Sequence, residues 1–328
     1  MGNNASREHS VSTTTSSHPT APMILLNALF PVLALIVFGW IVKRFAITDT
    51  AFHRTSDQLV YFVFFPLMLF WKIGSAPLLF DGNWRYLPAS ALAVVTVCGL
   101  SLLIIRHWPV RAFQAGSFNQ GCYRFNTYIG MAVVLNAFGG PGAQLYGVLI
   151  GLLIPLINLL CVPILIWYGG DGGRLGERLF ITLKHLLANP LILACVGGIA
   201  YSRLVGFFPG PIDNTLKLMS QVTLPLALFS IGGSLTSRNL RDNMGLALAA
   251  AGCKLLALPL VGLFFLWLFG VTGLAWQVSM LFFALPTSTA IYILSSQLNS
   301  DTELASAVIV LSTLLSFASM ALVLLVSG

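Results

Sequence analysis

Charged side chains are scarce in this sequence. Only 8% of the 328 residues are Asp, Glu, Lys or Arg, whereas 57% are hydrophobic. A soluble domain carries about three times this share of charge, because it needs a solvated surface. The composition therefore excludes a soluble enzyme or binding module and indicates an integral membrane protein.

Acidic residues are the rarest charged group, and none of the 10 Asp and Glu residues falls in the middle of an expected span. Asp57 and Asp213 are expected at helix starts, where a carboxylate can cap free backbone N–H groups. Asp301 and Glu303 are expected to begin the last helix. Intramembrane carboxylates are the usual ligands of coupled Na⁺ and the usual proton relays. Their absence argues against a carboxylate-based cation site, although hydroxyl and backbone oxygens could still bind Na⁺.

Metal-binding and catalytic signatures are also missing. The 5 cysteines form no Cys-x-x-Cys pair and lie in or beside apolar segments. This pattern predicts membrane-core side chains and neither a disulfide framework nor a metal site. The sequence contains no HExxH, GxSxG, phosphate-binding loop or serine–histidine–acid set. We therefore expect no cofactor, no metal and no enzymatic activity.

The basic residues give a formal net charge of +7. They are spread over short loops between apolar runs, which indicates membrane topology and argues against nucleic acid as a partner. The bases expected on one side are Lys43, Arg44, Arg54, Arg106, Arg111, Arg174, Arg178, Lys184, Arg238 and Arg241, and those on the other are Arg7, Lys72, Arg85, Arg203 and Lys217. The positive-inside rule puts the first group in the cytoplasm and both termini outside the cell.

About ten apolar segments, each near the ~20 residues that cross a bilayer, follow the N-terminal region. The expected spans are 23–43, 57–74, 85–106, 119–138, 143–168, 184–206, 212–234, 243–269, 274–296 and 302–326. Residues 1–22 are rich in Ser and Thr, lack the pattern of a cleaved signal and are expected to form a disordered tail. Met23 opens the first apolar segment and is a second candidate initiator.

The chain contains an internal repeat. Segment 66–75 aligns with segment 225–234, with six identities in ten positions at an offset of 159 residues (225 − 66). The same offset pairs Pro31 with Pro190 and Gly39 with Gly198. This register predicts an internal duplication. The expected domains are a five-helix repeat at 23–168, a cytoplasmic connector at 169–183 and a second five-helix repeat at 184–328.

A repeat with five spans leaves the membrane on the side opposite to its entry, so the second copy is inverted. This architecture is shared by many secondary transporters. The expected fold class is therefore all-α integral membrane, with about ten transmembrane helices arranged as two inverted five-helix repeats.

The fourth span of each repeat contains one polar stretch. It lies at Gln120–Gly130 in the first repeat and at Leu285–Ala290 in the second. In hydrocarbon, a helix that is interrupted by proline or by polar residues survives only where it lines a protein cavity. We predict that the fourth and ninth helices are broken and cross near the bilayer centre, with positive helix N-termini facing an anionic solute. The alternative is a pair of kinked but continuous helices whose hydroxyl groups bond back to the preceding turn.

Two cations accompany these stretches. Arg124 is about five residues inside its expected span (124 − 119) and either neutralises a substrate carboxylate or reaches the lipid headgroups. Lys254 has no other charge in its span, so we expect a cation that faces the cavity. Lys254→Ala is therefore expected to abolish transport while leaving the folded protein in the membrane. The residues predicted to bind the substrate are Asn126, Thr127, Tyr128, Pro286, Thr287, Ser288 and Thr289, with Lys254 and Arg124 as the cationic groups.

The chain after Met23 resembles the auxin efflux carrier family, in particular the bacterial branch of malonate- and malate-type carriers. The motifs that carry the resemblance are Phe30-Pro31 through Gly39, Phe65-Pro66-Leu67, Arg124 through Gly130, Asn189-Pro190, Leu224-Pro225-Leu226, Lys254-Leu255 with Pro259, and Ala284-Leu285-Pro286. Plant members of the family carry an Asn-Pro-Asn type of break. Here Asn126 is followed by Thr127, and Pro286 has no flanking asparagine, which argues against auxin as the substrate.

The resemblance implies ten helices in a scaffold domain and a transport domain, crossed fourth and ninth helices, and elevator-type alternating access. It also implies a small organic anion as substrate, in a multi-pass protein of the bacterial inner (plasma) membrane, and it allows a homodimer. One alternative is a Na⁺- or H⁺-coupled symporter of the bile-acid-transporter type, against which the missing intramembrane acids weigh. Another is a channel or a membrane receptor that transports nothing.

Overall fold

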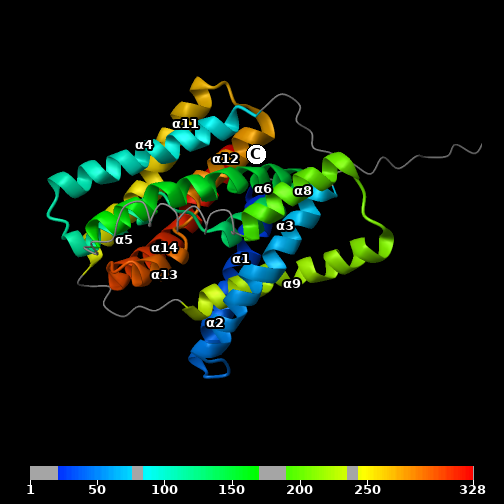
Figure 1. The fold of residues 1–328 in the computed structure, drawn as a ribbon, viewed down its shortest axis with the longest axis horizontal. Coiled ribbons are helices and arrows are strands. Elements are labelled where there is room, and N and C mark those ends of the chain that lie inside the picture. The colour runs from blue at the N-terminus through cyan, green and yellow to red at the C-terminus, as the bar shows by residue number, and fades with distance from the viewer. Residues whose placement is uncertain (1–20, 76–83, 170–189, 235–242, 328) are drawn as a thin grey trace, which may run out of the picture.

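The computed structural model describes residues 21–75, 84–169, 190–234 and 243–327. Within these ranges the chain is built from helices joined by short connections (Figure 1), which confirms the all-α class. The α-helices are α1 (Ala21–Arg44), α2 (Thr50–Leu59), α3 (Phe65–Gly74), α4 (Tyr86–His107), α5 (Ala112–Gly121), α6 (Thr127–Tyr168), α8 (Pro190–Leu204), α9 (Gly210–Ser234), α10 (Met244–Gly252), α11 (Leu258–Leu268), α12 (Gly273–Ala284), α13 (Ala290–Gln297) and α14 (Thr302–Ser327). Two π-helical turns, η1 (Val60–Phe64) and η2 (Cys253–Ala257), connect α2 to α3 and α10 to α11.

The expected tail at 1–22 lies outside the described residues except for its last two positions. The expected connector at 169–183 lies outside them except for Gly169.

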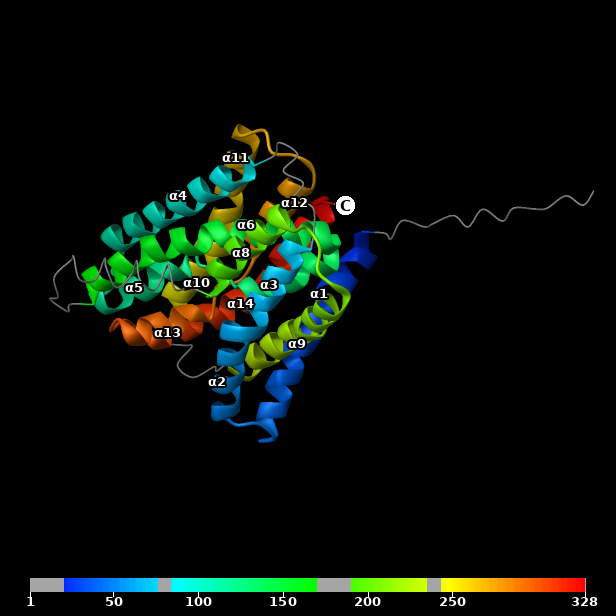
Figure 2. The same cartoon turned by 45° about the vertical axis from the view of Figure 1, so that its right-hand side comes forward.

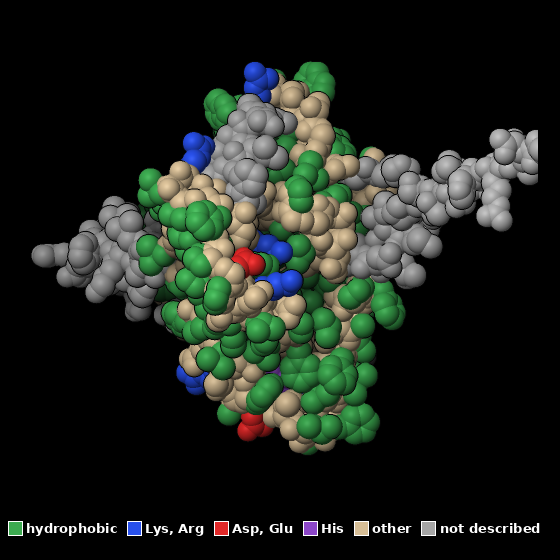
Figure 3. Space-filling view, turned by 90° about the vertical axis from the view of Figure 1, so that its right-hand side faces the viewer, with side chains coloured by type: hydrophobic (Ala, Val, Ile, Leu, Met, Phe, Trp, Pro, Cys, Tyr) green, Lys and Arg blue, Asp and Glu red, His purple; other side chains and the backbone are tan. Residues whose placement is uncertain are grey.

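Six helices in the described part of the chain are long and apolar enough to cross a membrane. They are Thr50–Gly74, Tyr86–His107, Thr127–Tyr168, Gly210–Gly233, Met244–Leu268 and Thr302–Val326, and two shorter apolar helices are Pro190–Leu204 and Gly273–Ala284. Large hydrophobic side chains cover much of the surface in Figure 3, and Trp167 and Leu204, for example, are more than three-quarters exposed at 78% and 84%. Such a surface suits hydrocarbon and is unfavourable in water. The protein is thus a multi-pass membrane protein.

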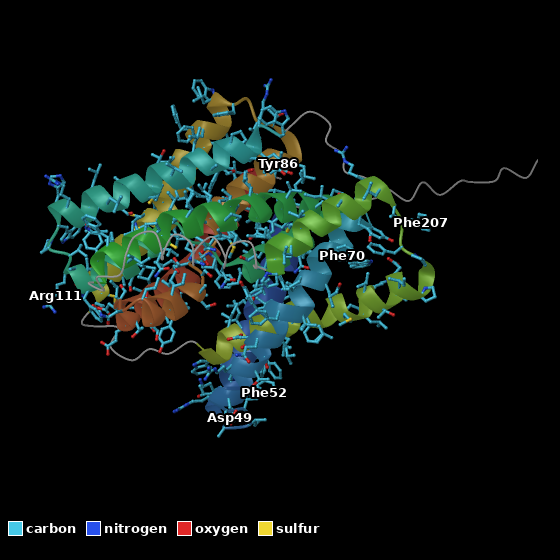
Figure 4. The ribbon with its side chains drawn as sticks, in the orientation of Figure 1. Asp49, Phe52, Phe70, Tyr86, Arg111 and Phe207 are labelled. Carbon is cyan, nitrogen blue, oxygen red and sulfur yellow. The ribbon has the colours of Figure 1, made fainter. Side chains whose placement is uncertain are left out.

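The second expected span begins at residue 50, seven positions before the expected start at 57 (57 − 50). Asp49 caps this helix, because its carboxylate accepts a hydrogen bond of 2.7 Å from the Phe52 N–H. Asp49 and Phe52 are labelled at one end of the molecule in Figure 4. The expectation that Asp57 is an N-cap is therefore wrong, and Asp57 lies in the third turn of the helix.

The other acidic residues are placed as follows. Asp213 lies in the first turn of α9, as expected of a residue at a helix start, and its carboxylate accepts a hydrogen bond of 2.7 Å from the Trp71 indole. Asp301 does begin the last helix, because its Oδ1 accepts hydrogen bonds from the N–H groups of Glu303 and Leu304, both at 2.9 Å.

The helices form two groups (Figures 1 and 2). One group contains α1, α2, α3, α8 and α9, and the other contains α4, α5 and α10 to α14. In the first group α1 packs on α9 and α3 packs on α8. The backbones of α1 and α9 approach closely, because a methyl group at Gly39 would meet the Phe229 carbonyl and one at Gly232 would meet the Ile36 carbonyl.

The long helix α6 contacts both groups. It changes direction at Gly139, whose φ of 64° and ψ of −155° are accessible to glycine and strained for other residues. Beyond this point, Gly147 packs against Ile73 of α3 and Gly151 packs against Cys195 of α8. This Gly-x-x-x-Gly pair therefore serves packing inside the chain.

Candidate functional site

The first polar stretch interrupts its helix between α5 and α6. Helix α5 ends at Gly121, and Asn126 is extended, with φ of −84° and ψ of 105°. The Asn126 Oδ1 accepts hydrogen bonds from the N–H groups of Tyr128 and Ile129, both at 3.1 Å. A side-chain cap of this kind contributes about 1 kcal/mol. Asn126 thus starts a new helix, α6, directly after the interruption.

The second polar stretch interrupts its helix between α12 and α13. Proline disfavours the helical conformation of the residue before it. Leu285, which precedes Pro286, is accordingly extended, with φ of −65° and ψ of 151°. Helix α13 begins at Ala290, and its N–H donates to the Ser288 hydroxyl at 3.2 Å.

The two interruptions, residues 122–126 and 285–289, contact each other through their backbones, and we call them together the helix junction. Phe125 and Thr287 form an antiparallel bridge, and the Asn126 N–H donates to the Pro286 carbonyl at 2.9 Å. The Phe125 ring also packs on Phe282, with ring centroids 4.5 Å apart. A continuous kinked helix cannot make these contacts, because its own i−4 groups would occupy the backbone.

Close packing at the junction depends on a glycine. A methyl group at Gly130 would overlap the Tyr146 hydroxyl and the Leu285 side chain. Gly130 lies in the first turn of α6, directly after the cap. The absence of a side chain there lets the second interruption approach the start of α6.

The breaks also expose helix C-termini, whose last carbonyl groups need partners. The Thr287 hydroxyl donates to the carbonyl of Gly121, the last residue of α5, at 3.0 Å. The Thr287 N–H in turn donates to the Ser312 hydroxyl at 3.1 Å. Thr287 is fully buried, so its polar groups serve the backbone of the junction.

Lys254 binds a free carbonyl at the C-terminus of α12. Its side chain is 0% exposed, and its Nζ donates to the Phe283 carbonyl in the last turn of α12 at 2.9 Å. A cation is favourable at this negative end of a helix. The observed partner of Lys254 is thus a backbone carbonyl freed by the break, and its predicted contact with a substrate stays a prediction.

Arg124 lies within the first interruption. Helix α5 begins at Ala112, so Arg124 follows twelve positions after the helix start (124 − 112), not about five. Its Nη1 donates to the Cys161 thiol of α6 at 3.2 Å, and the side chain is half-buried. The guanidinium therefore contacts α6, and both predicted roles of Arg124, substrate partner and headgroup anchor, stay predictions.

The predicted residues divide into two sets by exposure. Asn126, Pro286, Thr287 and Lys254 are buried and build the junction. The partly accessible ones are Arg124, Thr127, Tyr128, Ser288 and Thr289. These five side chains are the predicted residues at or beside the junction that are not fully buried.

A network of buried polar residues from α5, α13 and the start of α14 supports the junction, and apart from Gln120 its members were not singled out from sequence. Gln120 donates from Nε2 to the Ser295 hydroxyl at 3.0 Å and to the Ile291 carbonyl at 3.3 Å. Ser117 joins it, with its hydroxyl 2.8 Å from that of Ser295 and 3.0 Å from that of Ser300. The signal in the sequence was polarity inside α5, which extends seven residues before the expected start of the span.

Another neighbour of the junction comes from α2, η1 and α3. The Phe65 ring meets the Tyr128 ring edge-on, with centroids 4.9 Å apart. Tyr61 of η1 interacts electrostatically with Arg124. The accessible side of the junction thus faces the other group of helices.

Metal-ligating side chains do not gather in the part of the chain that the structure describes. No group of three or more His, Cys, Asp or Glu side chains there could hold a metal ion. The cysteines at positions 98, 122, 161, 195 and 253 are buried and form no disulfide.

Comparison with known proteins agrees with a carrier. Residues 174–324 match the family described as "Membrane transport protein". An uncharacterized transporter of Methanothermobacter thermautotrophicus is 25% identical over 301 residues, which are 90% of this chain and 96% of the relative. A proposed malonate transporter of Rhizobium meliloti is 24% identical over 310 residues, which are 90% of this chain and 93% of the relative.

The match of residues 174–324 to this family of membrane transport proteins and the similarity to the two transporters confirm the resemblance to the bacterial branch of the auxin efflux carriers. The protein is a membrane transporter.

Proposed function

We propose that the protein is a secondary active carrier of a small organic anion, such as a mono- or dicarboxylate, and that the anion binds at the helix junction. The observation that carries this proposal is the paired interruption. Helices α6 and α13 both begin there, and their N-termini present partial positive charge to an anion. Arg124 adds a full charge on the accessible side, and a guanidinium can bind a carboxylate with two parallel hydrogen bonds.

The architecture of two inverted five-helix repeats belongs to the same proposal. The offset of 159 residues relates Pro31 of α1 to Pro190 of α8, and Pro66 of α3 to Pro225 of α9. If the repeats are related by a two-fold axis, packing of α1 on α9 requires packing of α3 on α8. Both contacts occur and are extensive. This reciprocity supports the duplication.

Elevator-type alternating access would move one helix group against the other. The group with α4, α5 and α10 to α14 carries the junction, and the group with α1 and α9 would be the scaffold. A close backbone approach lies inside the scaffold, at Gly39 and Gly232, which suits a rigid unit. Both termini outside, a bacterial inner-membrane location and a homodimer remain predictions.

Malonate is the first substrate to test, because a relative is a proposed malonate transporter. Purified protein would be reconstituted into liposomes loaded with unlabelled malonate, and uptake of labelled malonate, a monocarboxylate or an indole acid would be measured. A carrier gives saturable counterflow. A channel gives flux without counterflow, and a receptor gives binding without flux.

The test of the site is Arg124→Gln. We expect the apparent affinity for the transported anion to fall at least tenfold, about 1.4 kcal/mol, because the charge at the junction is lost. Arg106→Gln, at the end of α4, is the matched control and should transport like the parent protein. Equal kinetics for the parent protein and Arg124→Gln would remove Arg124 from the anion site.

A further inference from the structure

Asp57 is an acidic residue inside a membrane helix. Because α2 begins at residue 50 and continues through η1 and α3, Asp57 lies in the third turn of an apolar helix of 25 residues. A carboxylate inside a transmembrane helix is costly and usually has a function. The Asp57 side chain is exposed on the surface of the described residues.

Asp57 shares a helix face with residues that contact the junction. Asp57, Tyr61 and Phe65 follow at intervals of four residues, a spacing that places side chains on one face. At the end of this row, Phe65 packs edge-on against Tyr128 at 4.9 Å. The π-helical turn η1 lies between Asp57 and Phe65, and such turns often occur at functional sites.

Helix α9 contributes Ser230 as a neighbour of Asp57. The Ser230 hydroxyl donates to the His53 carbonyl at 3.1 Å, one turn before Asp57. The same hydroxyl interacts with the Asp57 carboxylate, and Asp57 interacts electrostatically with Tyr128. Among the described residues, the titratable or charged groups around Asp57 include His53, Arg54 and Tyr61 on its own helix, Tyr128 on α6 and, beyond Tyr61, Arg124.

The accessible side of the junction thus has one fixed cation, Arg124, and one carboxylate, Asp57, with Tyr61 and Tyr128 between them. An anion that pairs with Arg124 is repelled by an ionised Asp57. The repulsion disappears when the carboxylate is protonated.

We propose that Asp57 is the proton-coupling group of the carrier, so that one proton travels with each anion. This inference rests on the proposed function of the junction. A hydronium ion from one side of the membrane protonates an Asp57 oxygen and leaves water. The neutral acid then admits the anion next to Arg124. After the helix groups exchange access, the anion leaves, and water on the other side takes the proton back.

Proteoliposomes that contain a pH-sensitive dye test this proposal. In the parent protein, we expect malonate uptake to acidify the lumen and its initial rate to fall by up to about tenfold for each unit of rising external pH, since one proton is bound per turnover. In Asp57→Asn, we expect malonate counterflow without luminal acidification and without that pH dependence.

Two further variants keep the test decisive. Asp49→Asn makes the same chemical change at the start of the same helix, where asparagine caps as well as aspartate, and should keep proton coupling. Asp57→Glu keeps a carboxylate at this position and should acidify the lumen as the parent protein does. This variant tests the proposal even if Asp57→Asn fails to fold.

The outcomes separate the two proposals. Anion counterflow by the parent protein without acidification, or acidification by Asp57→Asn as by the parent, would overturn the role of Asp57 and leave the carrier function intact. The absence of any anion flux in the parent protein would overturn both.

Discussion

The interruption at 122–126 and the interruption at 285–289 break their helices by different means. The second contains Pro286, which forces Leu285 out of the helical conformation. The first contains no proline, and the Asn126 side chain starts the next helix by capping two backbone N–H groups. One break is imposed by covalent geometry, and the other depends on hydrogen bonds.

The two interruptions also differ in how the preceding helix ends. At the end of α5, a neutral hydroxyl from Thr287 binds the free carbonyl of Gly121. At the end of α12, the ammonium of Lys254 binds the free carbonyl of Phe283. The cation of the first interruption, Arg124, lies on the accessible side. The cation of the second interruption, Lys254, is fully buried against the end of α12. The comparison shows that a buried basic side chain beside a helix break can bind a backbone carbonyl that the break has freed.

The largest effect is expected where the two interruptions touch. Gly130→Val should destabilise the protein by about 3 kcal/mol, because the new side chain overlaps Tyr146 and Leu285. Thermal unfolding in detergent, followed by tryptophan fluorescence, measures the change. Gly140→Ala is the control, since a methyl group there meets nothing within 4 Å. Equal losses in both variants would show that the close approach at Gly130 is unimportant.

Lys254→Met should have the next largest effect. It keeps the apolar stem but leaves the buried Phe283 carbonyl without its donor, which costs about 1–3 kcal/mol. We expect a lower unfolding temperature and loss of transport, while any anion binding that remains keeps its affinity. A variant with unchanged thermal stability and abolished binding would instead return Lys254 to the substrate site.

The caps should differ in a measurable way. Asn126→Ala removes a bond to two N–H groups, whereas Ser288→Ala removes a bond to one, so we expect losses of about 1–2 and about 0.5 kcal/mol. Because Pro286 breaks the second helix without help from Ser288, Asn126→Ala should impair transport more than Ser288→Ala, which removes one hydroxyl from the site and leaves the break in place. Comparison of unfolding temperatures and counterflow rates for the two variants checks this order. The reverse order would mean that the proline-containing break depends more on its cap.

Several features of this protein could be predicted from residue chemistry alone. The scarcity of charge and the long apolar runs indicate membrane helices, because hydrocarbon excludes unpaired polar groups. Pro286 and Asn126 mark the breaks for local reasons, since one excludes the helical conformation nearby and the other caps. The repeat offset is a property of the sequence and needs no coordinates.

Other features depend on where a helix begins and on what lies beside it. Asp57 appeared to be an end cap because Thr50 to Ser56 are polar, but Asp49 provides the cap and carries the helix seven residues further. Arg124 appeared to be near a membrane surface for the same reason, because α5 starts at Ala112. Helix boundaries are weakly encoded, since caps compete along a polar stretch.

The roles of the polar residues were decided by tertiary structure. Sequence determined that Lys254, Thr287, Ser288 and Arg124 stand near two broken helices. Only the packing of α12 against η2, and of the second interruption against α5, decided that Lys254 and Thr287 bind backbone carbonyls while Arg124 and Ser288 stay accessible. The physical reason is that a break frees backbone groups whose partners come from whichever helix lies beside them, and that neighbour can be more than a hundred residues away in the chain.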